Sequence, residues 1–153
     1  MADDDAVVEA LGRTKLFGAF PDKELRKVQQ AGKEISFAAG ADVTTKGEAG
    51  GRFFLILEGE ADVVLGGAAA ASRRIGPGET FGEIALLDGG PRTATVVAVS
   101  PLRTFSLASW NFRPLVLEHP ELATAVIATL CAWLREAGAG GGTAAGGPSS
   151  PAS

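Results

Sequence analysis

The spacing of apolar and polar residues changes along this chain, from a helical period to a strand period. Over Ala6–Leu11 apolar side chains recur at helical spacing. Pro21, followed by Asp22 and Glu24, is typical of the first turn of a second helix. From Lys33 onward, segments of about five residues are separated by glycine, which favours short strands. The sequence therefore predicts helices first and a sheet after them.

The middle of the chain predicts a β-barrel or roll, because many short strands follow one another at close spacing. The run Phe53–Leu57 is apolar throughout, which is typical of a strand buried on both faces. The run Ala68–Ala71 follows two glycines and is interpreted as a loose hairpin connection. The predicted strands are Lys33–Phe37, Asp42–Lys46, Arg52–Glu58, Glu60–Leu65, Ser72–Ile75, Thr93–Ala98 and Leu102–Leu107.

Helical spacing returns in the last third of the chain. A helix that begins at Ser109 contains Pro114, which lacks a backbone donor, so this helix is either kinked or regular only from Pro114. The next helix begins at Pro120 and carries an apolar stripe. That stripe consists of Leu122, Val126, Leu130, Trp133 and Leu134. From Gly138 only Gly, Ala, Thr, Ser and Pro occur, which predicts a disordered tail.

Composition and charge exclude several classes of protein. A chain of 153 residues supports about one domain. Its net charge of -4 argues against a generic nucleic-acid-binding surface. No apolar run approaches the roughly 20 residues that span a bilayer, and the N-terminus is acidic where a signal peptide is basic. We therefore expect a cytoplasmic protein that binds neither nucleic acid nor membrane.

The chain has one cysteine and one histidine, which limits its chemistry. Cys131 has no disulfide partner, and we expect it to be a small buried apolar residue. His119 precedes Pro120, where it is expected to cap the last helix. A histidine-rich metal site cannot be built from these residues, so no metal is expected, although a carboxylate-only site stays open.

The segment Phe81–Thr95 carries the residues suited to binding a ligand. Glu83–Leu87 is long enough for one helical turn after Gly82, and free backbone N–H groups at such a turn attract anions. Gly89-Gly90-Pro91 then turns the chain back so that Arg92 can face the same turn, where a guanidinium suits a phosphate. Glu83 can accept hydrogen bonds from sugar hydroxyls. In the alternative interpretation, Glu83 only stabilises the helix N-terminus and Arg92 is solvated or paired with it.

This segment, from Phe81-Gly82-Glu83 to Arg92-Thr93-Ala94, closely resembles the phosphate-binding cassette of the cyclic nucleotide-binding domain family. That family includes catabolite activator protein, regulatory subunits of cyclic-AMP-dependent kinase, and cyclic-nucleotide-gated channels. The resemblance implies an α+β fold: an eight-stranded antiparallel, jelly-roll-like β-roll with N-terminal helices, a short cassette helix and C-terminal helices. It implies a partly helical segment at 1–14, the binding domain at 15–137 and the tail at 138–153.

The resemblance also implies roles for individual residues. Arg92 pairs with the cyclic phosphate, Glu83 binds the ribose 2′-hydroxyl, and the amides of Ala85 and Thr93 donate to phosphate oxygens. Leu130 and Trp133 are the candidates to cap the base, although an apolar stripe at helical spacing is more typical of core packing. The full predicted ligand-binding set is Gly82, Glu83, Ile84, Ala85, Arg92, Thr93 and Ala94.

These residues predict a sensor and no enzyme. The expected ligand is 3′,5′-cyclic AMP, favoured over cyclic GMP, with no cofactor; Thr93 does not decide between the two nucleotides. The signal is expected to pass, through movement of the C-terminal helices, to a separate protein effector, because no effector segment is recognised in the chain. The alternative is a ligand-independent protein-interaction module with the same fold, and a nucleotide-processing enzyme ranks far below both. The oligomeric state stays open.

Overall fold

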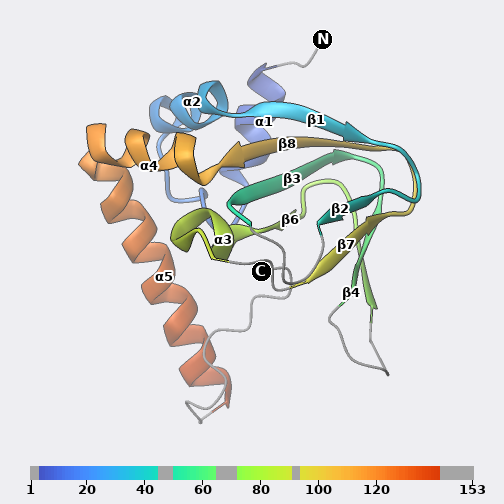
Figure 1. The fold of residues 1–153 in the computed structure, drawn as a ribbon. Coiled ribbons are helices and arrows are strands. Elements are labelled where there is room, and N and C mark those ends of the chain that lie inside the picture. The colour runs from blue at the N-terminus through green and yellow to red at the C-terminus, as the bar shows by residue number, and fades with distance from the viewer. Residues whose placement is uncertain (1–3, 45–49, 65–71, 91–93, 142–153) are drawn as a thin grey trace.

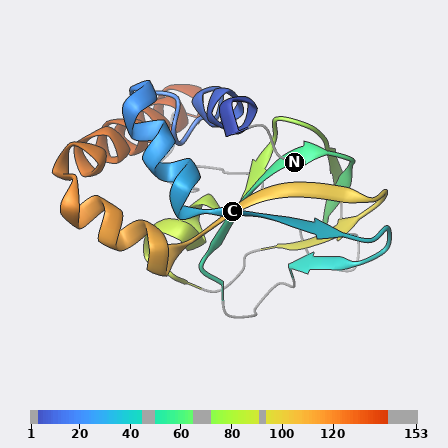
Figure 2. The same cartoon turned by 90° about the horizontal axis from the view of Figure 1, so that it is seen from above.

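Two four-stranded antiparallel sheets face each other at one end of the molecule, and helices gather at the other end (Figure 1, Figure 2). This computed structural model describes residues 4–44, 50–64, 72–90 and 94–141. Within these residues the predicted α+β class and the count of eight antiparallel strands are confirmed.

Both sheets are built from strands that are distant in sequence, as a roll requires. In the first sheet the order is β1 (Lys33–Phe37), β8 (Leu102–Ala108), β3 (Arg52–Glu58) and β6 (Thr80–Phe81). In the second sheet it is β2 (Asp42–Thr44), β7 (Thr95–Ala98), β4 (Ala61–Val64) and β5 (Ser72–Ile75). The helices are α1 (Asp4–Gly12), α2 (Asp22–Ala31), α3 (Glu83–Asp88), α4 (Ser109–Glu118) and α5 (Pro120–Gly141).

Strand β3 separates two hydrophobic cores. Phe53 and Leu55 face the helices and join a core that contains Phe17, which makes edge-to-face contacts with three other rings. Phe54 and Ile56 face the inside of the roll and join a second core. Because successive side chains of a strand point to opposite faces, a strand between two cores must be apolar at every position. The prediction that this run is buried on both faces is confirmed.

Most predicted elements are present, with differences at their ends. Strands β1, β3 and β5 have the predicted bounds, and β2, β4 and β7 are described over shorter ranges. The sequence interpretation missed β6, because its two residues are too few to show alternation. Residues 45–46, 65, 68–71 and 93, which the predictions also covered, lie outside the described residues.

The proline in α4 is accommodated inside the helix. The structure begins α4 at Ser109 and retains Pro114 within it, which decides against a helix regular only from Pro114. The bond that Pro114 cannot donate would go to the carbonyl of Trp110. Both residues are exposed, so water can reach that carbonyl.

Helix α5 differs from the sequence prediction in two respects. It continues through Gly138 to Gly141, inside the segment expected to be a disordered tail, and 142–153 lie outside the described residues. Cys131 is exposed and Leu134 is 56% exposed, so the predictions that Cys131 is buried and that Leu134 belongs to the inward stripe are wrong. Leu122 and Val126 define the buried face, and Cys131 lies on another side of the helix because each residue turns it by about 100°.

Helices α4 and α5 meet at a sharp corner. Their axes are bent by 114° relative to each other, and the His119 carbonyl accepts a hydrogen bond from the Leu122 N–H at 2.9 Å. His119 thus caps α5 through its backbone. Within the described ranges, no single helix is both long and apolar enough to cross a membrane, although the bent pair reaches that length and composition together.

Candidate functional site

The cassette segment is a tight turn that connects β6 to the short helix α3. Gly82 has φ 86°, in the left-handed region that favours glycine, and its carbonyl accepts the Leu86 N–H at 3.0 Å. Gly89 ends the helix with φ 70°, and its N–H donates to the Ala85 carbonyl at 2.8 Å. A glycine with positive φ at each end therefore sets the direction in which the chain enters and leaves α3.

Helix α3 lies at the seam between the two cores. Leu86 is fully buried in the helical core, whereas Phe81, just before the turn, stacks on Phe54 inside the roll with ring centroids 4.9 Å apart. Ala85 and Ala94 are also buried. Packing on both sides holds the turn in place, so the polar groups at its start are positioned by the fold.

Glu83 is the buried charged residue of this turn. It is 7% exposed, and its Oε2 accepts a hydrogen bond from Thr80 Oγ1 at 2.5 Å. Its other oxygen, Oε1, is buried and has no hydrogen-bond partner in the described part of the chain. A buried acceptor left without a donor costs about 1–3 kcal/mol, and more when it is charged. The Glu83 carboxylate is therefore held in place through Oε2, while Oε1 is buried without a donor among the described residues.

The structure brings four predicted ligand-binding residues together at the start of α3: Gly82, Glu83, Ile84 and Ala85. Ala94 is buried within the roll core, immediately before β7. Arg92 and Thr93 lie outside the described residues. Sequence reasoning missed Thr80, which fixes the Glu83 carboxylate; its only signal was a hydroxyl residue three positions before the glutamate.

The candidate base-capping residues pack against the helical core. Leu130 and Trp133 are both half-buried and contact that core from α5. In this arrangement they act as packing residues, and base capping by either one stays a prediction.

A contact route links the cassette to the C-terminal helices. Helix α3 packs against α4, and α4 packs against α5. An apolar groove of about 210 Å³ lies between these three helices and is lined by Leu86, Phe112 and Val126 among others. A shift of α3 would therefore change the surface on which α4 and α5 rest.

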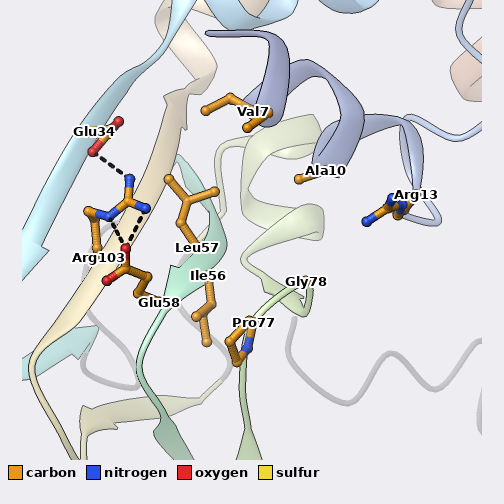
Figure 3. Close-up of a pocket in the computed structure, with 11 residues that line it drawn as sticks. Val7, Ala10, Arg13, Glu34, Ile56, Leu57, Glu58, Pro77, Gly78 and Arg103 are labelled. Atoms are coloured by element: carbon orange, nitrogen blue, oxygen red, sulfur yellow. Dashed lines mark hydrogen bonds and ion pairs between the residues drawn. The ribbon is translucent and has the colours of Figure 1, made fainter. Parts of the chain in front are cut away.

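A larger cavity of about 630 Å³ lies elsewhere, between α1 and the roll (Figure 3). Arg103 at its wall donates to Glu58 at 2.8 Å and to Glu34 at 3.1 Å, and these bonds raise the pKa of Arg103 above its ordinary value. Its charge is thus already matched by protein groups, and no cassette residue lines the cavity. The cassette turn remains the better candidate for ligand binding.

The chain is similar to known proteins over most of its length. Residues 34–119 match the family model for the cyclic nucleotide-binding domain. A cAMP-dependent protein kinase regulatory subunit from Yarrowia lipolytica is 32% identical over 114 residues, which cover 74% of this chain and 30% of that protein. A CRP-like cAMP-activated global transcriptional regulator from Mycobacterium tuberculosis is 26% identical over 132 residues, covering 83% of this chain and 58% of that protein.

Among solved structures, the N-terminal domain of a transcriptional regulator from Streptomyces coelicolor A3(2) superposes with a TM-score of 0.77 at 28% identity. The match covers 84% of this chain and 94% of that one. By contrast, this chain spans only 30% and 58% of the lengths of the two curated relatives.

Proposed function

This chain belongs to the cyclic nucleotide-binding domain family, and we propose that it is a sensor that binds 3′,5′-cyclic AMP at the cassette turn. The observation that carries this proposal is the Oε1 of the buried Glu83, which has no hydrogen-bond partner among the described residues. A ribose 2′-hydroxyl supplies the donor that this oxygen lacks. Nucleotide binding thus relieves a cost that the unliganded protein bears.

The remaining contacts follow from the family cassette. Arg92 pairs with the cyclic phosphate, and the amides of Ala85 and Thr93 donate to its oxygens. An arginine fork and backbone N–H groups suit phosphate because both are fixed donors and one carries the opposite charge. Gly82 lets the backbone approach the sugar, and Ile84 and Ala94 adjoin these residues in sequence.

Cyclic AMP is favoured over cyclic GMP because both curated relatives carry cyclic AMP in their names. No residue described in the structure discriminates between the two bases. A threonine at the position of Thr93 is compatible with either nucleotide in this family. The choice of nucleotide is therefore decided by titration.

The signal passes through the C-terminal helices to a separate protein. A ligand can shift an equilibrium only if it binds two arrangements with different affinity, and the contacts from α3 through α4 to α5 offer such arrangements. In the ligand-bound arrangement Trp133 or Leu130 of α5 covers the base. Among described residues, four of the five large exposed apolar side chains are on these helices: Trp110, Leu117, Ile127 and Leu134. Exposed apolar side chains on these helices are the residues that we expect an effector to contact.

Calorimetric titration of the full chain with cyclic AMP and with cyclic GMP tests the proposal. We expect saturable binding of one nucleotide per chain, with cyclic AMP the tighter ligand. A clear preference for cyclic GMP would overturn the choice of nucleotide. Absence of saturable binding for both would favour the ligand-independent interaction module.

A further inference from the structure

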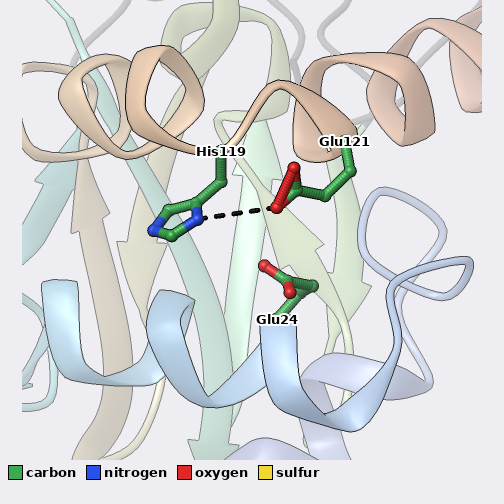
Figure 4. A group of neighbouring side chains, drawn as sticks. All are labelled: Glu24, His119 and Glu121. Atoms are coloured by element: carbon green, nitrogen blue, oxygen red, sulfur yellow. Dashed lines mark ion pairs between the residues drawn. The ribbon is translucent and has the colours of Figure 1, made fainter.

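Three side chains that could ligate a metal meet at the corner between α4 and α5. His119 is the single residue between these helices, and Glu121 is in the first turn of α5. Glu24, far away in sequence, reaches the same place from α2, which packs against α4. Figure 4 shows the Glu24 carboxylate directed toward the gap between the other two side chains. The cassette shares no residue with this group.

The spacing of the ligand atoms is close to what a metal ion requires. His119 Nδ1 and Glu121 Oε1 are 3.5 Å apart, and one ligand atom from each of the three residues lies within 4.8 Å of the others. Zinc bonds of about 2.0–2.1 Å in tetrahedral geometry place neighbouring ligand atoms about 3.3 Å apart. His119 Nδ1 and Glu121 Oε1 are already close to this separation, and Glu24 offers a carboxylate oxygen within 4.8 Å of both.

Glu24 supplies an independent observation, because only one of its two carboxylate oxygens has a partner among the described residues. Its side chain is 10% exposed, and Oε1 pairs with Lys27 Nζ at 3.3 Å. Its other oxygen, Oε2, is buried and has no hydrogen-bond partner among the described residues. A buried carboxylate oxygen is costly unless it is paired or coordinates a metal. A cation held with His119 and Glu121 satisfies it.

We propose that Glu24, His119 and Glu121 form a binding site for a divalent transition-metal ion, with zinc as the probe. One imidazole nitrogen and two carboxylate oxygens match zinc better than calcium or magnesium, which favour all-oxygen shells of six or more ligands. The three protein ligands leave a further position to water. The competing account is a direct contact between His119 and Glu121 that has no affinity for a metal.

The proposed metal site lies between α2 and the corner that joins α4 to α5. A bound ion joins α2 to the corner between α4 and α5 and so restrains the position of α5. If α5 moves when nucleotide binds, as the proposed function holds, the metal and the nucleotide change each other's affinity by the same factor. This consequence rests on the proposed function, whereas the metal site does not.

The test is calorimetric titration of the full chain with zinc chloride, after treatment with a chelator. All proteins carry Cys131→Ser, because the exposed thiol at that position is itself a zinc ligand. We expect one zinc ion per chain and a higher midpoint of thermal unfolding in its presence. Loss of a residue that only orients a metal ligand weakens metal binding by roughly 10- to 100-fold. Glu24→Gln and Glu121→Gln each remove a direct ligand, so each should weaken zinc binding by at least that much.

Glu118→Gln is the matched control, because Glu118 is exposed, adjoins His119 in sequence and does not belong to the cluster. It should bind zinc as tightly as the parent protein. The exposed position of Glu121 means that its variant folds even if Glu24→Gln does not. The proposal is overturned if the parent protein does not bind zinc, if Glu121→Gln leaves the affinity unchanged, or if Glu118→Gln weakens it equally. None of these results depends on nucleotide binding.

Discussion

Replacing Glu83 by glutamine should weaken nucleotide binding without weakening the fold. The carboxylate is nearly fully buried, so solvent screens its interactions little. Its Oε2 accepts a hydrogen bond from the Thr80 hydroxyl, and its Oε1 has no donor among the described residues. Glutamine keeps the shape and one acceptor oxygen but removes the charge.

The expected loss of affinity follows from the strength of the hydrogen bond to the ribose. A hydrogen bond to a charged group contributes about 1.5–3 kcal/mol, and one between neutral groups about 0.5–1.5 kcal/mol. The difference is about 1–1.5 kcal/mol, and about 1.4 kcal/mol corresponds to a factor of ten. Glu83→Gln should therefore bind cyclic AMP about tenfold more weakly.

The unliganded variant should be at least as stable as the parent. Weakening the bond from Thr80 costs about 1 kcal/mol. Glutamine still leaves one buried polar group without a partner, an amide N–H in place of Oε1, but it removes the larger cost of burying a charge there. Urea unfolding of both proteins without nucleotide measures this difference. A clearly lower unfolding free energy of the variant would mean that Glu83 stabilises the fold.

The assay for affinity uses two ligands, cyclic AMP and its 2′-deoxy analogue, with calorimetry on parent and variant. The analogue lacks the hydroxyl that Glu83 is proposed to bind. Substitution should thus cost about tenfold with cyclic AMP and nearly nothing with the analogue. An equal loss with both ligands would refute the assignment of Glu83 to the 2′-hydroxyl.

Other substitutions test the fold and the movement of α5. Phe17→Ala removes a fully buried ring that contacts three others and should lower the unfolding free energy by about 3–5 kcal/mol in urea unfolding. Gly59→Ala places a Cβ 2.3 Å from a backbone oxygen, whereas Gly78→Ala, at a similar positive φ, meets nothing within 4 Å. In both variants the left-handed backbone conformation should lower the unfolding free energy by about 1–2 kcal/mol, and in Gly59→Ala the clash should lower it clearly further. Equal losses in the two variants would contradict the clash. In a Trp110→Phe background, saturating cyclic AMP should change the fluorescence of Trp133 if α5 moves over the base; an unchanged spectrum would contradict base capping by Trp133.

The sequence was sufficient for features that depend on short stretches of chain. The unbroken apolar run of β3 required burial on both faces, and the structure places two cores there. The cassette motif predicted a helical turn after Gly82, and α3 begins at Glu83. Both predictions rest on neighbouring residues, whose local geometry the sequence largely determines.

Features that depend on distant residues were not predicted. Strand β6 exists because Thr80 and Phe81 pair with β3. Two residues are too few to predict that pairing from the sequence. The outward position of Cys131 follows from the way α5 packs on the helical core. Glu24, His119 and Glu121 come together only after α2 packs against α4, and composition alone does not reveal such a group.

The central claim is that a cyclic phosphate binds at the cassette, and the nucleotide affinity of Arg92→Ala tests it most directly. Loss of one member of a buried charge pair costs about 2–5 kcal/mol, so the variant should bind cyclic AMP at least about thirtyfold more weakly than the parent. Arg74→Ala is the control, because Arg74 is exposed on β5 and paired with Asp62, and it should bind as the parent does. The claim is contradicted if the parent binds cyclic AMP and Arg92→Ala binds it equally well.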